Sequence, residues 1–131
     1  MASKWASIRL SELSLAIGPF VIGPAVERKI GLSAFSHLAL NATEWQTAEW
    51  AKSKGLFQDV FETVEQLDTY LETFLDRFID YSPAALAQFK AMFWEGTEDW
   101  PVVMEQRATQ SGNLVLTEKA QEAIKLSLIH I

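Results

Sequence analysis

The sequence predicts a single α/β unit that is mostly helical. Three observations support this fold class. Apolar residues alternate loosely near the N-terminus, glycine and proline interrupt the chain over residues 18–24, and apolar residues recur mainly at helical spacing beyond that loop. With 131 residues, 49% of them hydrophobic, the chain fits one domain or part of one and has ample material for a core.

The first third of the chain is expected to hold a strand and two short helices. Ala6–Leu10 is predicted as the strand, and the glycines and prolines of residues 18–24 then break regular structure. Ala25–Ile30 is predicted as a helix that ends at Gly31, and Ser33–Asn41 as a second helix.

A third short helix and a second strand are expected next. Ala48–Lys54 is predicted to be helical, and Gly55 after it can adopt the left-handed turn that closes helices. Leu56–Phe61 alternates as a short strand would.

The remaining half is predicted to be helical. The strongest signal is one continuous apolar stripe, formed by Val64, Leu67, Leu71, Phe74, Leu75 and Phe78. Ser82 and Pro83 then restart a helix that ends at Gly96. Thr97 is expected to cap the following helix, which Ser111–Asn113 would break, and Thr117 to cap a last helix from Glu118 to about Leu126.

The composition excludes several classes of function. The net charge is −6, and the 11 Lys and Arg residues form no basic stripe, which argues against a nucleic-acid surface. The chain has no cysteine and only two widely separated histidines, so a zinc site has no support. We expect no membrane-spanning segment, no signal peptide and a cytoplasmic location, because no apolar run is long enough for either segment.

The candidate site residue is Glu12, which follows the predicted strand and precedes the Gly/Pro loop. Such a position favours a catalytic acid or base, because positioning and strain concentrate at loops beside rigid elements. The alternative is a solvated carboxylate, or one paired with Arg9.

Three motifs, taken together, resemble the C-terminal half of the enoyl-CoA hydratase/isomerase (crotonase) superfamily. Glu12 takes the position of the glutamate that precedes the family's glycine-rich loop, with Pro19 and Gly23 at the loop's proline and last glycine. The family's Ala-x-x-Ala-x-x-x-Gly-Leu-Val pattern matches residues 48–57. Its final Ser-Glu-Asp-x-x-Glu-Gly-like helix matches residues 117–123, with Ala123 in place of the usual glycine.

The resemblance implies a fold and a domain division. Residues 1–61 would be the last strand-helix turns of a β/α spiral, and residues 62–126 a helical region that mediates trimerisation and helps to close the acyl pocket. Residues 127–131 are apolar and uncapped, and we interpret them as an artefactual tail. The chain would then be a fragment, with the oxyanion-hole segments and a first catalytic glutamate encoded upstream.

The resemblance also implies a reaction. Glu12 would be the general acid/base of an enoyl-CoA hydratase, and Gly18, Pro19, Phe20 and Gly23 would line the substrate site. Coenzyme A would be part of the substrate, with no separate cofactor or metal, and the full-length protein would be a trimer or a dimer of trimers. Phe20, Val21 and Ile22 replace the small residues usual in the loop, which would reshape the acyl pocket. An enoyl-CoA isomerase of the same family and a non-catalytic helical oligomerisation module remain alternatives.

Other residues are interpreted conservatively. Arg28 and Lys29 could reach a phosphate, but solvated charges are the simpler interpretation, and His37 is expected to be packed or exposed rather than functional. Four tryptophans (Trp45, Trp50, Trp94 and Trp100) are interpreted as core or interface anchors. The core is also the default position of Phe89, Met92, Phe93 and Trp94, with an acyl tunnel or a subunit contact as alternatives.

Overall fold

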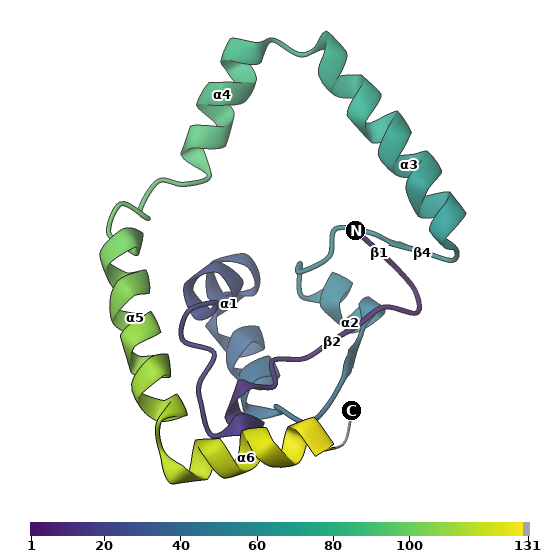
Figure 1. Cartoon of the computed structure of the whole chain (residues 1–131). Coiled ribbons are helices and arrows are strands. Elements are labelled where there is room, and N and C mark those ends of the chain that lie inside the picture. The colour runs from purple at the N-terminus through teal and green to yellow at the C-terminus, as the bar shows by residue number, and fades with distance from the viewer. Residues whose placement is uncertain (130–131) are drawn as a thin grey trace.

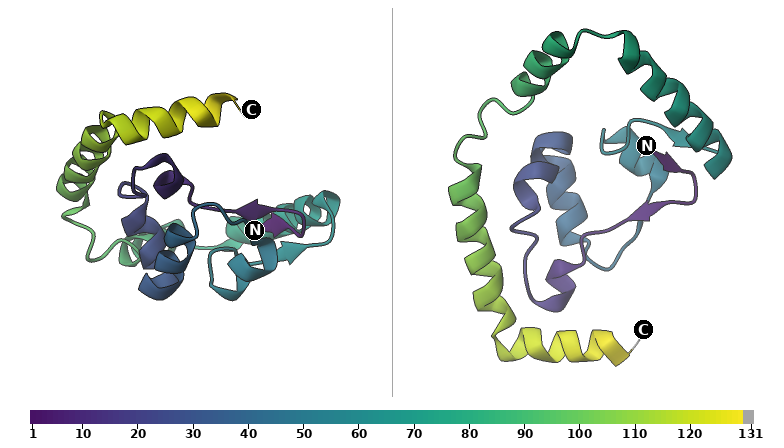
Figure 2. Two further views of the ribbon diagram at one scale, coloured as in Figure 1. Left: turned by 90° about the horizontal axis from the view of Figure 1, so that it is seen from below. Right: turned by 45° about the horizontal axis from the view of Figure 1, so that its top comes forward.

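The computed structural model describes residues 1–129 and shows a small body with a long helical arch around it. Helices α1 and α2 and the short strands form the body, and α3 to α6 run around it in sequence order (Figure 1). The two further views show that the arch leaves the plane of the body at its C-terminal end (Figure 2). The mostly helical fold with few strands is therefore confirmed.

Two pairs of very short strands tie the N-terminus to the middle of the chain. Strand β1 (Ala2–Ser3) runs parallel to β4 (Val60–Phe61), and β2 (Ser7–Ile8) runs antiparallel to β3 (Gln46–Thr47). A salt bridge between Lys4 and Glu62 adds to the first pair.

Both predicted strands exist, but each is much shorter than expected. The first is limited to Ser7–Ile8 because the chain turns at Ala6, whose N–H donates to the Ser3 carbonyl, and enters a 3-10 helix soon after. The second is limited to β4. The N–H groups of Leu56 and Phe57 bond back to the Ala51 carbonyl and are thereby used in closing the preceding helix.

Helix α1 (Gly23–Leu40) contains both helices predicted for this segment. Gly31 has φ 77° and ψ 160°, which is not helical and divides α1 into two parts at the residue where the sequence predicted a stop. The second part carries Leu38, only 1% exposed, which forms the core with Leu10 and Ala39. Phe35 and Trp50 pack against this cluster.

Helix α2 (Ala48–Ser53) is fixed at both ends by local chemistry. The Thr47 hydroxyl accepts a hydrogen bond from the Trp50 N–H at 3.1 Å, and Gly55 has the expected positive φ of 78°. Ala48 and Ala51 are fully buried, so α2 lies very close to its neighbours.

Helices α3 (Val64–Asp76) and α4 (Pro83–Met92) form an arm, joined by the 3-10 helix η2 (Arg77–Asp80). Both helices have a side-chain cap at their start. Ser82 makes its predicted cap by accepting from the Ala85 N–H, and Thr63, which was not predicted as a cap, accepts from the Gln66 N–H. The apolar stripe forms on α3, yet four of its six members are exposed: Val64, Leu71, Leu75 and Phe78. The default core position of Phe89, Met92, Phe93 and Trp94 is wrong for this chain, because all four are more than half exposed.

Helix α5 (Trp100–Val115) runs straight through the predicted break at Ser111–Asn113. Gly112 lies in this helix on the exposed side, where no turn is required of it. The predicted Thr97 cap is also wrong. The Thr97 hydroxyl instead donates to the Trp94 carbonyl at 2.6 Å, closing the preceding segment, and the helix begins after Asp99.

Helix α6 (Glu118–Ile129) begins as predicted and extends past the predicted end. The Thr117 hydroxyl accepts from the Ala120 N–H at 3.4 Å, and Ala120 is fully buried near the 3-10 helix η1 (Glu12–Leu15), against which α6 packs. Residues 127–129 continue the helix, while 130 and 131 of the predicted tail lie outside the described residues. Within residues 1–129, no helix has the length and apolarity that a membrane span requires.

Candidate functional site

Glu12 is the first residue of η1, a 3-10 helix that was not predicted from the sequence. The 3-10 helix ends at Ala16, whose φ of 58° and ψ of 24° put a residue with a β-carbon in the left-handed region. Ala16 is the only non-glycine residue with positive φ in the part of the chain that the structure describes. The Ile17 N–H then donates to the Glu12 carbonyl at 3.0 Å, so the chain turns back beside Glu12.

A pocket of about 460 Å³ opens at Glu12. Its other walls are mainly apolar, formed by Ile17, Gly18, Pro19, Phe20, Val21, Ile22, Ala25, Met104 and Ser111. Glu12 is half-buried, and its Oε2 atom is buried without any hydrogen-bond partner in the described structure. A buried carboxylate oxygen without a partner is costly, so we expect a hydrogen-bond donor from a ligand, a water or another part of the complete protein to meet it.

The predicted substrate-site residues are brought together by the structure, with one exception. Gly18, Pro19 and Phe20 line the pocket beside Glu12. Gly23 does not line it. It is buried at the start of α1, where a β-carbon would lie 3.2 Å from the Phe35 ring, so close helix packing accounts for a glycine there.

The loop that forms the pocket wall is a tight structure. The Phe20 N–H donates to the Gly18 carbonyl at 2.8 Å, and the Gly23 N–H donates to the Pro19 carbonyl at 2.9 Å. The Phe20 ring lies directly on Gly18. The loop residues therefore have defined positions relative to Glu12.

Three residues on one face of α5 contribute to this region, and sequence reasoning missed all three. Met104 and Ser111 line the pocket, and Arg107 lies between them in sequence. Spacings of three and four residues put them on one face of a helix. The signal was present in the sequence, but the expected break at Ser111 placed that residue outside the helix.

Arg28, one of the two candidate phosphate ligands, has a different role. Its Nη2 atom donates to the main-chain carbonyls of Phe93 (2.8 Å) and Glu95 (2.9 Å), which ties α1 to the end of α4. His37 stacks on Trp50 with the ring centroids 5.6 Å apart, and its Nδ1 lies 3.3 Å from the Asn41 amide nitrogen. His37 is thus an exposed residue stacked on Trp50, within the expectation that it would be packed or exposed.

The tryptophans differ in their surroundings. Trp50 packs on the core, whereas Trp45 is 59% exposed and lies 4.4 Å from the Arg9 guanidinium. That stacking also gives Arg9 a partner other than Glu12. Trp94 and Trp100 form an edge-to-face pair across the link between α4 and α5, with centroids 6.0 Å apart.

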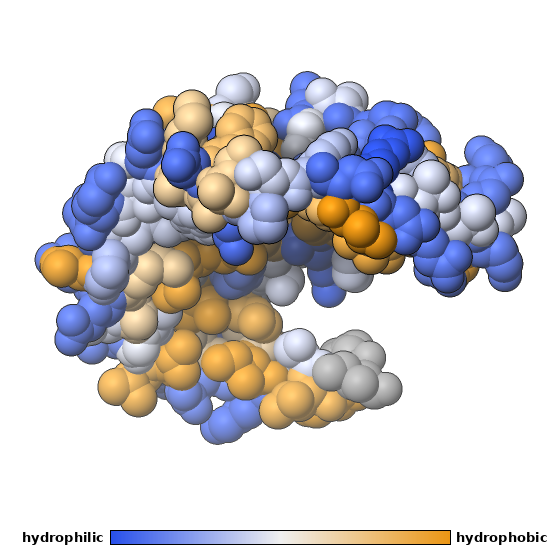
Figure 3. Space-filling model, turned by 90° about the horizontal axis from the view of Figure 1, so that it is seen from above, coloured by the Kyte–Doolittle hydropathy of each residue, from blue (hydrophilic) through white to orange (hydrophobic). Residues whose placement is uncertain are grey.

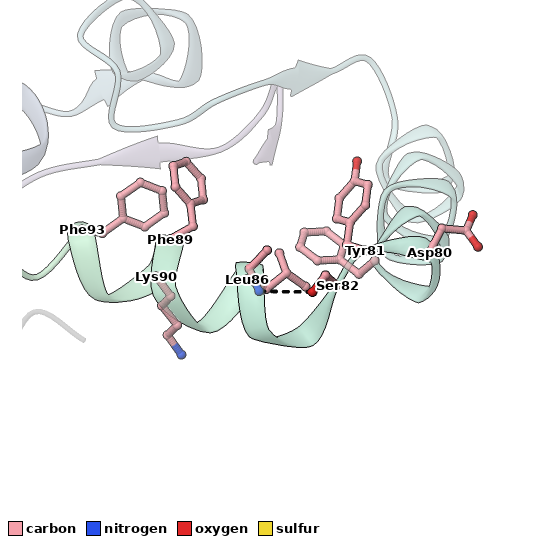
Figure 4. Close-up of a pocket in the computed structure, with 9 residues that line it drawn as sticks. Asp80, Tyr81, Ser82, Leu86, Phe89, Lys90 and Phe93 are labelled. Atoms are coloured by element: carbon pink, nitrogen blue, oxygen red, sulfur yellow. Dashed lines mark hydrogen bonds between the residues drawn. The ribbon is translucent and has the colours of Figure 1, made fainter.

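A second and larger pocket, of about 840 Å³, lies on the arm. Phe78, Tyr81, Leu86, Phe89 and Phe93 provide most of its wall. In Figure 4 the rings of Tyr81, Phe89 and Phe93 point to the side of the arm that faces the body, while Asp80 and Lys90 point elsewhere. The polar side chains among its described wall residues are Asp80, Tyr81, Ser82 and Lys90, and the rest of the wall is apolar.

Another hollow lies between α6 and the body, with hydrophobic side chains on its surface (Figure 3). Across residues 1–129, no group of three or more histidine, aspartate and glutamate side chains is arranged to hold a metal ion.

Comparison with known proteins supports the fold. The sequence matches no protein-family model and no curated protein sequence. Solved structures do match. An enoyl-CoA hydratase from Bacillus halodurans has a TM-score of 0.85 at 20% identity, covering 95% of this chain and 50% of that one. An enoyl-CoA hydratase/isomerase from Pseudoalteromonas atlantica T6c has a TM-score of 0.86 at 18% identity, covering 98% and 52%.

A third match, at higher identity, agrees with these two. An enoyl-CoA hydratase/isomerase from Marinobacter aquaeolei is 26% identical with a TM-score of 0.66, and the match covers 98% of this chain and 48% of that one. The chain thus spans about half the length of the solved structures it matches, as the resemblance predicted. The chain has the fold of enoyl-CoA hydratase/isomerase (crotonase) superfamily proteins over about half their length, consistent with their C-terminal half.

Proposed function

We propose that the complete protein is a cytoplasmic enoyl-CoA hydratase, in which Glu12 acts as general acid/base on the acyl part of a 2-enoyl-CoA thioester. The observation that carries the proposal is the Oε2 atom of Glu12, which is buried without a partner in a mainly apolar pocket. The Gly18–Phe20 wall of the same pocket, predicted as substrate-binding from the sequence, supports it.

In this proposal, the part of the reaction performed by residues of this chain is proton transfer. In hydration, the oxygen of water bonds to the β-carbon of the double bond, a carboxylate base takes one proton from that water, and a proton is added to the α-carbon. A carboxyl group beside the α-carbon can deliver that proton, and positioned proton transfer of this kind is worth roughly 10²- to 10⁴-fold in rate. The developing charge on the thioester oxygen needs N–H donors, which we propose come from the part of the fold outside these residues.

The size of the side chains that line the pocket affects which acyl groups fit into it. Phe20, Val21 and Ile22 stand where the family usually has small residues, and Met104 adds a further apolar wall. We propose that the pocket selects the acyl chain by shape, with coenzyme A bound as part of the substrate and no additional cofactor.

Isomerisation is the first alternative, because one carboxylate can also move a proton between two carbons of a 3-enoyl thioester. The complete protein should therefore be assayed with matched 2-enoyl- and 3-enoyl-CoA substrates. The hydratase proposal expects 3-hydroxyacyl-CoA from the 2-enoyl substrate. Conversion of the 3-enoyl to the 2-enoyl substrate with no hydration would contradict it and support the isomerase.

A non-catalytic oligomerisation module is the second alternative. The exposed arm supports oligomerisation, which this alternative and the hydratase proposal share. Val64, Leu75 and Phe89 are more than half exposed. Large exposed apolar surfaces of this kind are usually buried when a protein binds a partner. We propose that this surface is covered in a homo-oligomer of the complete protein, a trimer or a dimer of trimers. Light scattering on the purified protein measures the assembly, and a monomer that retains activity would contradict this part of the proposal.

A further inference from the structure

The Arg107 side chain connects helix α5 to the loop that forms the wall of the Glu12 pocket. Its Nη1 atom donates to the Phe20 carbonyl at 3.3 Å, in a partly buried contact between residues 87 positions apart. The same nitrogen lies beside Gly23, where a β-carbon would be 3.4 Å from it. Arg107 therefore meets the loop at Phe20 and at the residue where the loop enters α1.

Arg107 is an unusual residue to use for a single main-chain contact. Half-buried arginines commonly pair with a carboxylate, but neither ion pair found within residues 1–129 includes Arg107. A guanidinium donating to a carbonyl makes a charge-assisted hydrogen bond, and at 3.3 Å this one is longer than the usual range. The contact links α5 to one carbonyl of the loop.

The position of that carbonyl matters for the pocket. The Phe20 N–H bonds to Gly18 and the Gly23 N–H bonds to Pro19, so the loop's own hydrogen bonds fix its two sides, while the Phe20 carbonyl is fixed from α5. Met104 and Ser111, one turn before and one turn after Arg107, line the pocket from the same helix. A loop released from Arg107 would move relative to both walls.

We infer that Arg107 is a positioning residue: it holds the loop of residues 18–22 against α5 and so sets the distance between that loop and Glu12. The inference rests on the proposed function for its effect on rate, but the positioning itself is a property of the fold. Displacements of about 1 Å at a reacting group can cost about 100-fold in rate.

Hydrogen exchange tests the positioning without reference to activity. In the complete protein, Arg107→Ala should raise the exchange rate of amides in residues 18–23, including the Gly23 N–H, at least tenfold. Exchange in α2 should not change. The matched control is Gln106→Ala, at the exposed neighbouring position, which should change the amide exchange rate in neither segment. Unchanged exchange in residues 18–23 of the Arg107→Ala variant would overturn the inference, whether or not the proposed function is correct.

Kinetics then separates positioning from general stabilisation. Arg107→Ala should lower kcat 10- to 100-fold with KM changed less than threefold. Arg107→Lys, which keeps one donor, should recover part of the loss, and so should millimolar guanidinium added to Arg107→Ala. A fall in melting temperature with unchanged kcat at a permissive temperature, or a loss that neither lysine nor guanidinium restores, would overturn it. If Arg107→Ala does not fold, Arg107→Lys compared with Arg107→Gln gives the same test.

Discussion

The Phe20 ring rests on Gly18 at a distance that leaves no room for a side chain. A β-carbon on residue 18 would come within 2.5 Å of the Phe20 Cζ atom. The backbone of Gly18 is not in the left-handed region, since positive φ values occur at other glycines of the described chain. A side chain at residue 18 would therefore have to displace the ring of Phe20, while the backbone conformation itself does not require glycine.

Gly18→Ala should consequently displace the Phe20 ring into the pocket. We expect a loss of about 1–3 kcal/mol in the free energy of unfolding, the usual cost of overpacking. Removing the ring should relieve the clash, so Gly18→Ala/Phe20→Ala should be no less stable than Phe20→Ala alone. Denaturant titrations of the three variants check this double-mutant cycle.

Gly112→Ala is the matched control for glycine replacement. Gly112 lies within α5 with no atom within 4 Å of its would-be β-carbon, so alanine should stabilise the helix by up to about 1 kcal/mol. A stabilising effect of both Gly→Ala changes would contradict the packing described for Phe20.

Arg28 should matter for stability rather than for ligand binding. Arg28→Ala removes two hydrogen bonds to the carbonyls of Phe93 and Glu95, and we expect a loss of about 1 kcal/mol because the contacts are solvent-exposed. Lys29→Ala, at the adjacent exposed position, should have no measurable effect. Equal effects of the two substitutions on thermal unfolding would show that the Arg28 contacts contribute nothing.

The stability of the turn at Gly96 should decrease at acidic pH. The N–H groups of Glu98 itself and of Gly96 lower the pKa of the Glu98 carboxyl below its ordinary value of 4.5. A lowered pKa in the folded state means that the ionised form stabilises the fold above pH 4.5, and that this contribution is lost as pH falls through the lowered pKa. Tryptophan fluorescence of the Trp94–Trp100 pair should report the change. Glu98→Gln should remove this pH-dependent change in fluorescence. An acid transition identical to that of the unchanged protein would contradict a stabilising role for the Glu98 carboxylate.

Several helix ends were predictable from local chemistry, although the local signals at Thr97 and at Ser111–Asn113 were misleading. Gly31 and Gly55 have the positive φ that their predicted stops require, and Ser82 and Thr117 make the predicted caps. These signals act within four residues of each other, so neighbouring residues alone carry the information.

Strand lengths and burial were not predictable, because they depend on distant partners. Ala6–Leu10 has a strand-like pattern, but only Ser7–Ile8 finds a partner, at β3. The stripe on α3 was recognised correctly as a helix face, yet periodicity cannot say what covers it, and in this chain four of its six members are exposed.

The candidate site was predictable only in part for the same reason. Glu12, Gly18, Pro19 and Phe20 are close in sequence, so one motif could identify them together. Arg107 contacts Phe20 from 87 residues away, and only the packing of α5 reveals it. The catalytic role of Glu12 remains a prediction.

The 131-residue chain by itself should show no hydratase activity. It spans about half the length of the matched structures, and we propose that the N–H donors for the thioester oxygen lie outside it. Losing one such donor typically costs 10²- to 10³-fold, so losing all of them should leave the rate at background. Hydration of crotonyl-CoA by the purified chain, above the rate of buffer alone, would contradict this expectation.

The central claim is that the Glu12 carboxyl performs the proton transfer, and its removal is the most direct measurement. Glu12→Gln in the complete protein keeps the shape of the side chain and removes the acid/base. We predict a fall in kcat of about 10²- to 10⁴-fold, with oligomeric state and melting temperature unchanged. Glu44→Gln, at an exposed position, should retain full activity. A Glu12→Gln enzyme that hydrates its substrate at the rate of the Glu44→Gln control would contradict the account.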